Sequence, residues 1–491
     1  MKLENMTETH PHLSVGGHWI AGVFTEDSPS RSAVTSPVTG AVVATVPSGT
    51  AADVDAAVAA ARAALPGWSS WSPLSRAEAL ERMAAELTAR NEEIAQAITA
   101  EIGVPISLSR AAQAALPPAV AVATAQIVSE IHWEQRIGDS LIVREPVGVV
   151  GAITPWNFPL QQTMTKLAPA LLAGNTVVFK PAELAPLTAA ILARAIEDAG
   201  IPAGVFNVVF GAGGVVGEAL AAHPDVNMIS FTGSTAAGKR VAVVASGTVK
   251  RVALELGGKS ANIVLDGADL DAVAAHTLMN SWTNSGQACG AWTRLLVPSN
   301  LHDELVERLV AAAAEYSVGD PSDPAVRVGP LASEKQWERV NGYIKRGIAD
   351  GATLAYGGPG RVEGLETGAF VRPTIFARVD PDSAIAQEEI FGPVLSVIAY
   401  DDVDQAVEIA DSTMYGLTAA VFGPHNEAVA VARRLHVGQV YLNGAGLNMR
   451  APFGGYKQSG NSREFGTFGI EEFTELKAIQ LGEAQTGGVA L

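Results

Sequence analysis

The sequence contains a single cysteine in 491 residues, and its neighbours are small and polar. Cys289 lies in "NSWTNSGQACGAWTR" (280–294), directly after "SGQA" and before Gly290. A cysteine in such a loop is accessible to a substrate, and it acts as a nucleophile if its pKa is lowered. The alternative is a buried cysteine that only fills space, which is the commoner case for a lone cysteine. This loop alone leaves both alternatives open.

A carboxylate follows a short apolar run in "VALELGGKS" (252–260). Open α/β sheets bind ligands beyond the carboxyl ends of their strands. Glu255 stands at such an end, where it could serve as a general base. The alternative is a helix cap or a surface salt bridge.

An asparagine lies between two prolines in "TPWNFP" (154–159). Pro155 and Pro159 stiffen the loop, so the amide of Asn157 could be held in a fixed orientation. A fixed amide can donate a hydrogen bond to an oxyanion. The alternative is a structural turn asparagine.

Three further stretches suit a nucleotide. In "FKPAE" a lysine and an acid, Lys180 and Glu183, suit phosphate or ribose hydroxyls. In "FTGSTAAGK" Ser234 precedes a helix, whose N-terminal amides can receive a pyrophosphate. The glycine-rich turn "FGAGGVVG" (210–217) contains Gly213 but does not meet the G-x-G-x-x-G spacing, so it is a weak signal.

Apolar runs rich in β-branched residues alternate with helical periodicity, which indicates parallel sheets covered on both faces. We expect strands at 147–153, 175–180, 205–209, 226–233 and 250–256, with helices at 160–173, 187–199, 214–222 and from 235. After a break at Gly257-Gly258, strands are expected at 260–265, 293–298, 394–400 and 418–422, with helices at 269–284 and 300–316. Helical periodicity also covers 53–64 and 75–101.

Two pieces fit neither alternation. Residues 133–146 look like a hairpin with its turn at Gly138-Asp139, and 474–481 looks like a lone strand. Isolated strands are seldom stable. These pieces could therefore pair with each other as an arm, or with another subunit.

Composition limits the protein's class. A chain of 491 residues is too long for one core, and 48% hydrophobic with 17% charged residues is ordinary for a globular enzyme. A net charge of −18 argues against binding nucleic acid or anionic lipid. One cysteine cannot form an internal disulfide, and no apolar run reaches the roughly 18 residues of a membrane span. The N-terminus lacks a signal-peptide stretch. We expect a cytoplasmic protein without a metal site.

Eight stretches occur together in a characteristic order over about 300 residues: "TPWNFP", "KPAE", "FTGS", "LELGGKS", "GQAC", "EEIFGPV", "LN" and "PFGGYKQSG". In these motifs the chain resembles the aldehyde dehydrogenase superfamily over nearly its whole length. The resemblance is to the NAD(P)-dependent, hydrolytic, non-acylating type, because members that transfer the acyl group to coenzyme A usually lack the glutamate found here at Glu255.

The resemblance implies a covalent mechanism. Cys289 would attack the aldehyde to give a thiohemiacetal, whose oxyanion is held by the Asn157 amide and the Cys289 backbone N–H. Hydride transfer to nicotinamide would leave a thioester, and Glu255 would activate the water that hydrolyses it. Lys166 and Glu464 match a family lysine and a glutamate linked to proton relay.

The resemblance also implies NAD as the cofactor, with NADP less favoured. A carboxylate at Glu183 accepts hydrogen bonds from ribose hydroxyls but repels a 2′-phosphate. The residues expected to bind the cofactor are Trp156, Lys180, Glu183, Gly213, Gly233, Ser234, Glu389 and Phe391.

The family's architecture implies a Rossmann-like NAD-binding domain (1–125 and 147–257), a second α/β catalytic domain (258–470) and a small β oligomerisation arm (126–146 and 471–491). The chain would form a homodimer or a homotetramer.

The substrate pocket should be lined by residues 158–165, 282–292 and 443–453. These stretches favour an apolar or aromatic aldehyde. Arg450 could meet a substrate carboxylate, although a solvated arginine is the simpler interpretation. The alternatives are an NADP-dependent semialdehyde dehydrogenase and a non-catalytic binding or structural member of the fold.

Overall fold

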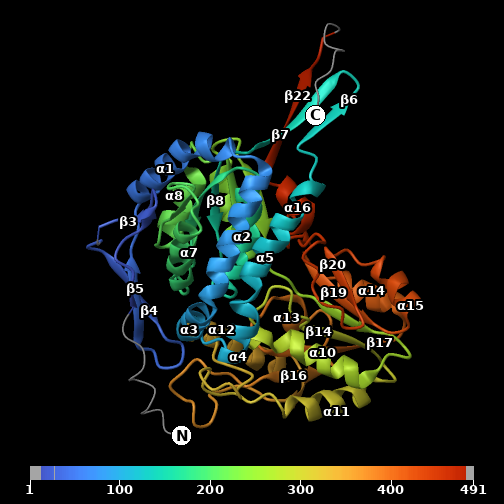
Figure 1. Ribbon diagram of the computed structural model, residues 1–491. Helices are drawn as coiled ribbons and strands as arrows, with labels where there is room; N and C mark the ends of the chain where they lie inside the picture. The colour runs from blue at the N-terminus through green and yellow to red at the C-terminus, as the bar shows by residue number, and fades with distance from the viewer. Residues whose placement is uncertain (1–12, 27, 483–491) are drawn as a thin grey trace.

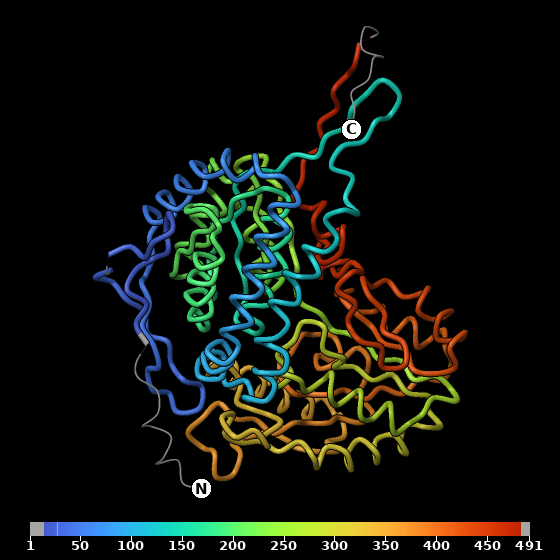
Figure 2. Tube along the Cα trace, in the orientation of Figure 1, coloured from blue at the N-terminus to red at the C-terminus, as the bar shows by residue number. Residues whose placement is uncertain are grey.

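The structure is a computed structural model that describes residues 13–26 and 28–482. Two seven-stranded sheets form two α/β bodies, and a three-stranded sheet projects from them as an arm (Figures 1 and 2). A further three-stranded sheet near the N-terminus consists of β1 (Leu13–Ser14), β5 (Val42–Pro47) and β4 (Arg31–Thr35). The expected fold class is confirmed.

The first sheet has the order β12-β11-β8-β9-β10-β2-β3. Its parallel members are β8 (Val149–Ile153), β9 (Thr176–Lys180), β10 (Phe206–Val208), β11 (Met228–Thr232) and β12 (Arg251–Glu255), each within two residues of its expected position at either end. The antiparallel strands β2 (Trp19–Ile20) and β3 (Val23–Phe24) extend one edge. Two-residue strands carry too little periodicity to be predicted.

The register of this sheet determines where the candidate site lies. Ile153 pairs with Lys180 and with Phe231, and Thr232 pairs with Glu255. The carboxyl ends of four parallel strands therefore lie in one row, and the loops that follow them lie on one edge.

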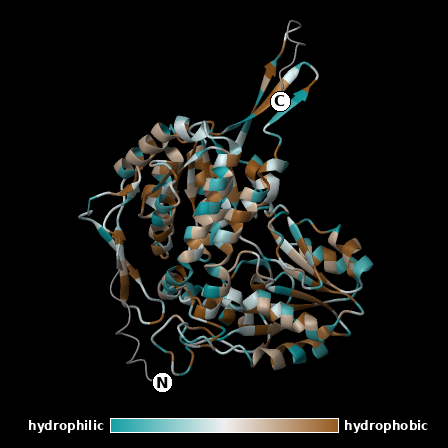
Figure 3. Ribbon diagram, in the orientation of Figure 1, coloured by the Kyte–Doolittle hydropathy of each residue, from teal (hydrophilic) through white to brown (hydrophobic). Residues whose placement is uncertain are grey.

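Helices cover both faces of the first sheet (Figure 1). They are α1 (Ala51–Ser69), α2 (Pro73–Ala89), α3 (Asn91–Ile102), α5 (Leu116–Gln126), α6 (Pro159–Leu172), α7 (Leu187–Asp198), α8 (Glu218–Ala222) and α9 (Thr235–Ala245), with the π-helix η4 (Gly213–Gly217) before α8. All five residues of β8, β9 and β11 are buried, as expected for parallel strands with two covered faces. In Figure 3 brown apolar segments are prominent in these inner strands.

The helical periodicity over 75–101 corresponds to two helices. The segment forms α2 and α3, because Arg90 between them has φ −100° and ψ 13°. Its backbone N–H ends the first helix on the carbonyls of Leu87 and Thr88, and its guanidinium binds Glu86 and Asp198. Both helices keep an apolar face, so periodicity alone does not reveal the break.

Residues Ile106–Glu130 form a helical run of 25 residues with a hydropathy of 1.4, which would suit a membrane span by length and composition. It includes α4 (Ile106–Leu108), the π-helix η2 (Ser109–Gln113), α5 and η3 (Val128–Glu130). Half of its most apolar window is buried inside the protein, which is the pattern of a core helix.

The second sheet has the order β15-β16-β17-β14-β13-β19-β20. Its strands are β13 (Ala261–Val264), β14 (Arg294–Pro298), β15 (Thr353–Tyr356), β16 (Thr374–Ala377), β17 (Val394–Tyr400), β19 (Thr418–Phe422) and β20 (Gln439–Leu442). Only β15 is antiparallel. Its helices are α10 (Leu270–Trp282), α11 (His302–Ala313), α12 (Glu334–Ala349), α13 (Ala384–Gln387), α14 (Val403–Asp411) and α15 (His425–Ala432). The short helix α16 (Gly466–Glu471) and the pair β18 (Tyr415–Gly416) and β21 (Tyr456–Lys457) complete the chain's elements near the site.

The arm confirms the expected pairing of the two odd pieces. Strands β6 (Glu134–Ile137) and β7 (Ser140–Pro146) form the hairpin, and β22 (Thr474–Gln480) pairs with β7. The arm lies outside both bodies (Figure 2). β6 is exposed along its whole length and β22 along all but Thr474.

Candidate active site

A buried acidic cluster lies at the end of β12. Glu255, 3% exposed, accepts a hydrogen bond from Ser462 Oγ at 2.8 Å. Beside it, Lys166 Nζ on α6 lies 2.6 Å from Glu464 Oε1 in a buried ion pair. Glu255 Oε2 has no hydrogen-bond partner among the residues that the structure describes. In this cluster the Glu464 carboxylate is therefore paired with Lys166, whereas Oε2 of Glu255 is free to bind a ligand.

The surroundings raise the pKa of Glu255 well above its ordinary value. Burial is the main cause and the charge of Glu464 adds to it, while Ser462, Lys166 and Arg463 oppose the shift. A carboxyl with a raised pKa suits a general base that must hold and release a proton near neutral pH. The surface salt bridge considered for Glu255 is not what the structure contains.

The chain segment after residue 452 closes over this cluster. Gly460 forms an antiparallel bridge with Glu255, and Phe453 forms one with Glu464. A Cβ at Gly460 would lie 2.1 Å from the Leu254 carbonyl oxygen, so this close approach requires glycine. The C-terminal motif thus brings Glu464 to a strand end that lies about 200 residues earlier in the chain.

The loop before Cys289 has an unusual backbone. After α10, the residues Asn284, Ser285 and Gly286 all have left-handed φ values, 52°, 55° and 72°. Non-glycine residues hold this conformation only where other contacts fix it. Ser285 Oγ donates to the Gly329 carbonyl at 2.9 Å, and the Gln287 side chain accepts from the Ala332 N–H at 2.9 Å. The loop is therefore rigidly held.

This loop is joined directly to Asn157. Asn157 Nδ2 donates to the Gln287 carbonyl at 2.9 Å, and Asn284 Nδ2 donates back to the Asn157 carbonyl at 2.9 Å. Asn157 is buried, and its amide nitrogen carries a second hydrogen, since an amide has two donors. The fixed amide therefore contacts the loop at Gln287, two positions before Cys289 in the sequence, and its oxyanion role stays a prediction.

Cys289 itself is half-buried, so it is less accessible than its neighbours suggest. Burial raises the pKa of its thiol to about 12, with further contributions from Glu389, Glu255 and Glu464. The lowered pKa that a nucleophilic cysteine needs is therefore not present in this structure. Proton removal must accompany attack, and the nearby carboxylates are the available acceptors.

The nucleotide residues form a second group at the same sheet edge. Glu183 is exposed, and its Oε1 accepts the Gly213 N–H at 2.8 Å. Lys180 is buried, donates to the Pro181 carbonyl at 2.9 Å, and has its pKa lowered by burial. Ser234 caps α9 by accepting the Ala237 N–H. The glycine-rich turn thus serves to fix the Glu183 carboxylate.

The last expected cofactor residues lie between the two bodies. Glu389 Oε1 accepts the Gly258 N–H at 3.1 Å, and burial raises its pKa. Trp156 packs edge-on against Phe391 with ring centroids 5.4 Å apart. Gly233 donates its N–H to the Glu255 carbonyl at 3.1 Å, which ties the turn before α9 to the end of β12.

Sequence reasoning missed four residues that hold the site. Ser462 contacts Glu255, and Asn284 contacts Asn157. Gln113 donates to the Asn157 carbonyl at 3.0 Å. Lys259 is buried in the quoted motif "ELGGKS" but received no role. Ser462 lies two residues before Glu464, and Asn284 lies five residues before Cys289, so closeness to an expected site residue could have indicated both. Gln113 lies in a helical segment that has no such neighbour.

An open apolar groove of about 640 Å³ lies between α5 and the loop after β20. Pro118, Ala119 and Val122 line one wall, and Leu447 and Met449 line the other. None of the described residues that line the groove is charged. The loop at 443–453 was expected at the pocket; α5 was not, and the other two expected stretches do not line this groove.

Arg450, next to this groove, forms an exposed ion pair with Glu130. The solvated arginine is therefore the interpretation that the structure supports.

The chain is similar to known proteins over nearly its whole length. Residues 24–479 match the model of the aldehyde dehydrogenase family. A 3-succinoylsemialdehyde-pyridine dehydrogenase from a Pseudomonas species is 47% identical over 94% of this chain and 97% of its own length. The crystal structure of a mutant of aldehyde dehydrogenase C from Pseudomonas syringae, in complex with NAD+ and octanal, has a TM-score of 0.95 at 48% identity, covering 97% of this chain and 99% of that one. An indole-3-acetaldehyde dehydrogenase in complex with NAD+ has a TM-score of 0.93 at 41% identity, covering 97% and 99%.

Proposed function

The chain belongs to the aldehyde dehydrogenase family, and from that premise we propose that it oxidises an apolar aldehyde to the carboxylic acid with NAD. Oxidation of an aldehyde through a catalytic cysteine is the general reaction of this family. The observation that carries the proposal is the hydrogen-bonded loop that fixes the Asn157 amide beside the segment leading to Cys289.

In the first step the Cys289 thiol gives its proton to the free oxygen of Glu255, which releases it before the second step, and Sγ attacks the aldehyde carbon to form a thiohemiacetal. The second amide hydrogen of Asn157 then donates to the oxyanion. Because that amide is already oriented by Gln287, little reorganisation is needed in the transition state. When bound, NAD accepts the hydride, and a thioester remains on Cys289.

In the second step Glu255 removes a proton from the water that hydrolyses the thioester. Its free Oε2 offers the acceptor, and Ser462 holds the other oxygen. The buried Lys166–Glu464 pair lies beside Glu255 and gives the proton a route onward. The acid is then released and the thiol is restored.

The nucleotide side of the first body fits NAD. A Cβ added at Gly213 would meet nothing closer than 3.9 Å and one at Gly214 nothing within 4 Å, so this turn is open to a ligand. The first N–H groups of α9 have no partners within the helix and suit a pyrophosphate. The exposed Glu183 carboxylate, fixed by Gly213, would accept ribose hydroxyls and repel the 2′-phosphate of NADP.

The uncharged groove beside α5, which we assign to the substrate, suits an apolar aldehyde. The relative in complex with octanal agrees with an aliphatic aldehyde, whereas the relative named for a pyridine semialdehyde agrees with an aromatic one. A semialdehyde carboxylate needs a free cation, and Arg450 is engaged with Glu130. We therefore favour an aliphatic aldehyde of medium length over a semialdehyde. We also propose a cytoplasmic homodimer or homotetramer, assembled through the arm.

The test is a panel of aldehydes assayed for NADH absorbance, with NAD and NADP compared. We expect kcat/KM to rise from acetaldehyde to octanal. It should also be at least about tenfold higher with NAD than with NADP, which corresponds to a free-energy difference of about 1.4 kcal/mol between the two cofactors. Cys289→Ser should abolish turnover while circular dichroism shows an intact fold. Turnover by that variant near the wild-type rate would exclude the covalent role, and the absence of turnover with every aldehyde would favour the non-catalytic alternative.

A further inference from the structure

A buried glutamine outside every expected motif contacts the backbone of Asn157. Gln113 is 1% exposed, and its Nε2 donates to the Asn157 carbonyl at 3.0 Å across 44 positions of the chain. It is the last residue of the π-helix η2. Helices of this kind are rare, and single turns of them are frequent at functional sites. The fold therefore brings an unusual local structure to the residue that we propose as the oxyanion donor.

The Asn157 carbonyl also accepts a hydrogen bond from the second body. Asn284 Nδ2 donates to it at 2.9 Å, and Asn284 lies in the loop that leads to Cys289. A carbonyl oxygen has two lone pairs, so the two side-chain amides use its full capacity. The peptide unit after Asn157 is thereby held from two sides, by η2 and by the loop before Cys289.

Holding this carbonyl also holds the side chain. The carbonyl carbon and Cβ of Asn157 are bonded to the same Cα, so a shift of the carbonyl displaces the side chain with it. The side-chain amide donates one hydrogen to the Gln287 carbonyl at 2.9 Å, which sets the direction of the other. A misplacement of about 1 Å in a reacting group can cost about 100-fold in rate. Gln113 thus contacts the backbone on which the position of the oxyanion donor depends.

The Gln113 side chain is only partly satisfied. Its Oε1 is buried and has no hydrogen-bond partner among the residues that the structure describes. A buried acceptor without a partner lowers stability, and the hydrogen bond made by Nε2 offsets only part of that cost. Departures of this kind from the most stable choice are expected at functional sites. The contact with Asn157 is therefore better explained by function than by stability.

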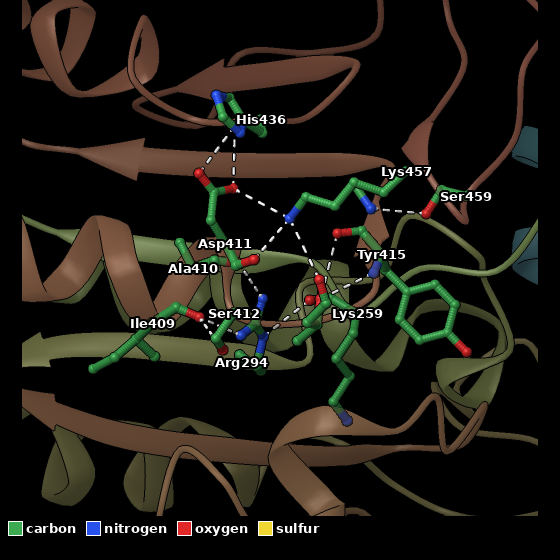
Figure 4. A network of polar contacts seen from close by, with 12 residues as sticks. Lys259, Arg294, Ile409, Ala410, Asp411, Ser412, Tyr415, His436, Lys457 and Ser459 are labelled. Carbon is green, nitrogen blue, oxygen red and sulfur yellow. Dashed lines mark hydrogen bonds and ion pairs between the residues drawn. The ribbon is translucent and has the colours of Figure 1, made fainter.

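A structural network in the second body shows the contrast. Arg294 is also buried, and its guanidinium donates to the carbonyls of Lys259, Ile409 and Ala410 at 2.9, 2.7 and 2.7 Å (Figure 4). None of these carbonyls belongs to a residue with a proposed chemical role. Because a guanidinium has donors only, Arg294 leaves no buried acceptor unpaired. Gln113 differs from Arg294 in both respects.

We propose that Gln113 is a positioning residue for the oxyanion donor: by holding the Asn157 carbonyl, it keeps the Asn157 side-chain amide where the thiohemiacetal oxyanion forms. This inference rests on the proposed function, which assigns the oxyanion to that amide. Gln113 acts through Asn157 and needs no contact of its own with the aldehyde or the cofactor. The alternative is a glutamine that only packs η2 against its neighbours.

The test is the rate constant of NADH formation in a single turnover, with enzyme in excess over octanal and NAD saturating. Gln113→Met removes the donor and keeps the length of the side chain. We expect it to slow NADH formation about tenfold, which is part of the roughly 100- to 1,000-fold weight of an oxyanion donor. NAD affinity, measured by tryptophan fluorescence, and the urea midpoint of unfolding should stay at their wild-type values, because the variant loses a hydrogen bond and an unpaired acceptor together.

Asn157→Ala separates positioning from packing. Gln113 binds the backbone carbonyl, so this variant keeps that contact and loses only the oxyanion donor. In the Asn157→Ala background, Gln113→Met should have no further effect on the rate, because the group that it positions is gone. A tenfold loss in both backgrounds would mean that Gln113 acts by another route, and it overturns the inference.

Gln113→Glu adds a pH signature that packing alone does not produce. The introduced carboxyl group can donate to the Asn157 carbonyl in its neutral form but not in its ionised form. The rate of this variant relative to wild type should therefore fall as pH rises from 5.5 to 9, through a pKa that burial raises. If Gln113→Met does not fold, this measurement decides: a relative rate that does not change with pH overturns the inference.

Asn262→Leu is the matched control. Asn262 is buried, its Nδ2 donates to Thr277 Oγ1 at 2.9 Å, and its Oδ1 has no partner among the described residues. This amide is bonded in the same way as that of Gln113 but contacts no residue of the candidate site, so the variant should keep the wild-type rate.

The outcomes separate this inference from the proposed function. A Gln113→Met protein with the wild-type rate overturns the inference and leaves the proposed function intact. An Asn157→Ala protein with the wild-type rate removes the oxyanion assignment itself. A wild type that forms no NADH from any aldehyde overturns both.

Discussion

At the scale of single residues, Glu255 is where geometry and electrostatics predict the clearest kinetic effect. We expect Glu255→Gln to form the thioester but to hydrolyse it about 100-fold more slowly, the usual weight of a general base. Mixing the variant with aldehyde and NAD should give a burst of NADH about equal to the enzyme, followed by slow turnover. Mass spectrometry should detect an acyl adduct on Cys289. A normal steady-state rate without an adduct would exclude the role.

The raised pKa of Glu255 gives the same prediction a pH signature. A general base works in its ionised form, so wild-type hydrolysis should rise with pH as Glu255 ionises. Ser462 lowers that pKa by its hydrogen bond, and Ser462→Ala should therefore shift the rising limb to higher pH without creating a burst. The Glu255→Gln rate should lack this limb.

The groups that we propose to react can be predicted from the sequence because each stands in a compact motif, but the contacts that hold them cannot. Asn284 binds Asn157 across 127 positions, and Lys166 binds Glu464 across 298. Such contacts depend on how strand ends align, which residue spacing does not encode. The sequence does not predict the high pKa of the Cys289 thiol for the same reason, since it comes mainly from burial, to which the charges of three carboxyl groups from distant segments add.

At the scale of elements, most strands and helices of the two sheets follow from the alternation of apolar runs and helical periodicity. The exceptions share one cause. Their positions are set by local backbone conformation or by long-range packing, and the sequence pattern contains neither. The break at Arg90 and the short strands β2 and β3 are such cases. The helix α3 is also tied to α7 by a buried group that the pattern does not reveal.

That group is Glu101 on α3, which is 1% exposed and accepts the N–H of Leu187, the first residue of α7, at 2.8 Å. Burial raises its pKa well above the ordinary value, and its second oxygen has no partner among the described residues. The folded state therefore binds a proton more tightly than the unfolded state. Its contribution to the free energy of unfolding must fall as pH rises from about 4.5 towards the folded pKa.

We expect Glu101→Gln, which keeps an acceptor for Leu187 without a charge, to match the wild type near pH 5 and to be the more stable protein at pH 8. Urea unfolding at both pH values measures the difference in the free energy of unfolding between the variant and the wild type. The contributions of other buried acids are common to both proteins and cancel. Glu101→Ala, the control, also lacks the carboxyl but leaves the Leu187 N–H unpaired, so it should be about 1 kcal/mol less stable than Glu101→Gln at both pH values. A difference between Glu101→Gln and wild type that does not change with pH contradicts the argument.

At the scale of the whole molecule, the arm is the part whose exposed surface needs an explanation. Its register places Ile137, Ile142 and Leu476 on one face, since Leu476 pairs with Arg144, Ser140 pairs with Ile137, and alternate residues share a face. Ile137 is 59% exposed and Leu476 is 61% exposed. Large apolar side chains gathered on a projecting sheet are typical of a protein–protein contact.

The opposite face also has apolar side chains, Leu141 and Val143, but it carries more charge. It carries the ion pair between Lys477 and Glu145, and it includes Ile479, which is 41% exposed. If the arm joins subunits, the apolar face with Leu476 should meet the partner and the charged face should remain in water. The pairing of β22 with β7 is internal to the chain, so a substitution on either face should leave the arm itself folded.

We therefore expect Leu476→Glu to raise the dissociation constant of the assembly at least about tenfold, because a buried carboxylate would cost more than 1.4 kcal/mol at the contact. Sedimentation velocity at micromolar concentration should detect a smaller particle, with circular dichroism unchanged. Ile479→Glu is the matched control, since it places the same charge in the same strand on the other face, and it should keep the wild-type mass. Equal dissociation of both variants would mean that the wrong face was chosen, and a monomeric wild type would remove the arm's assigned role altogether.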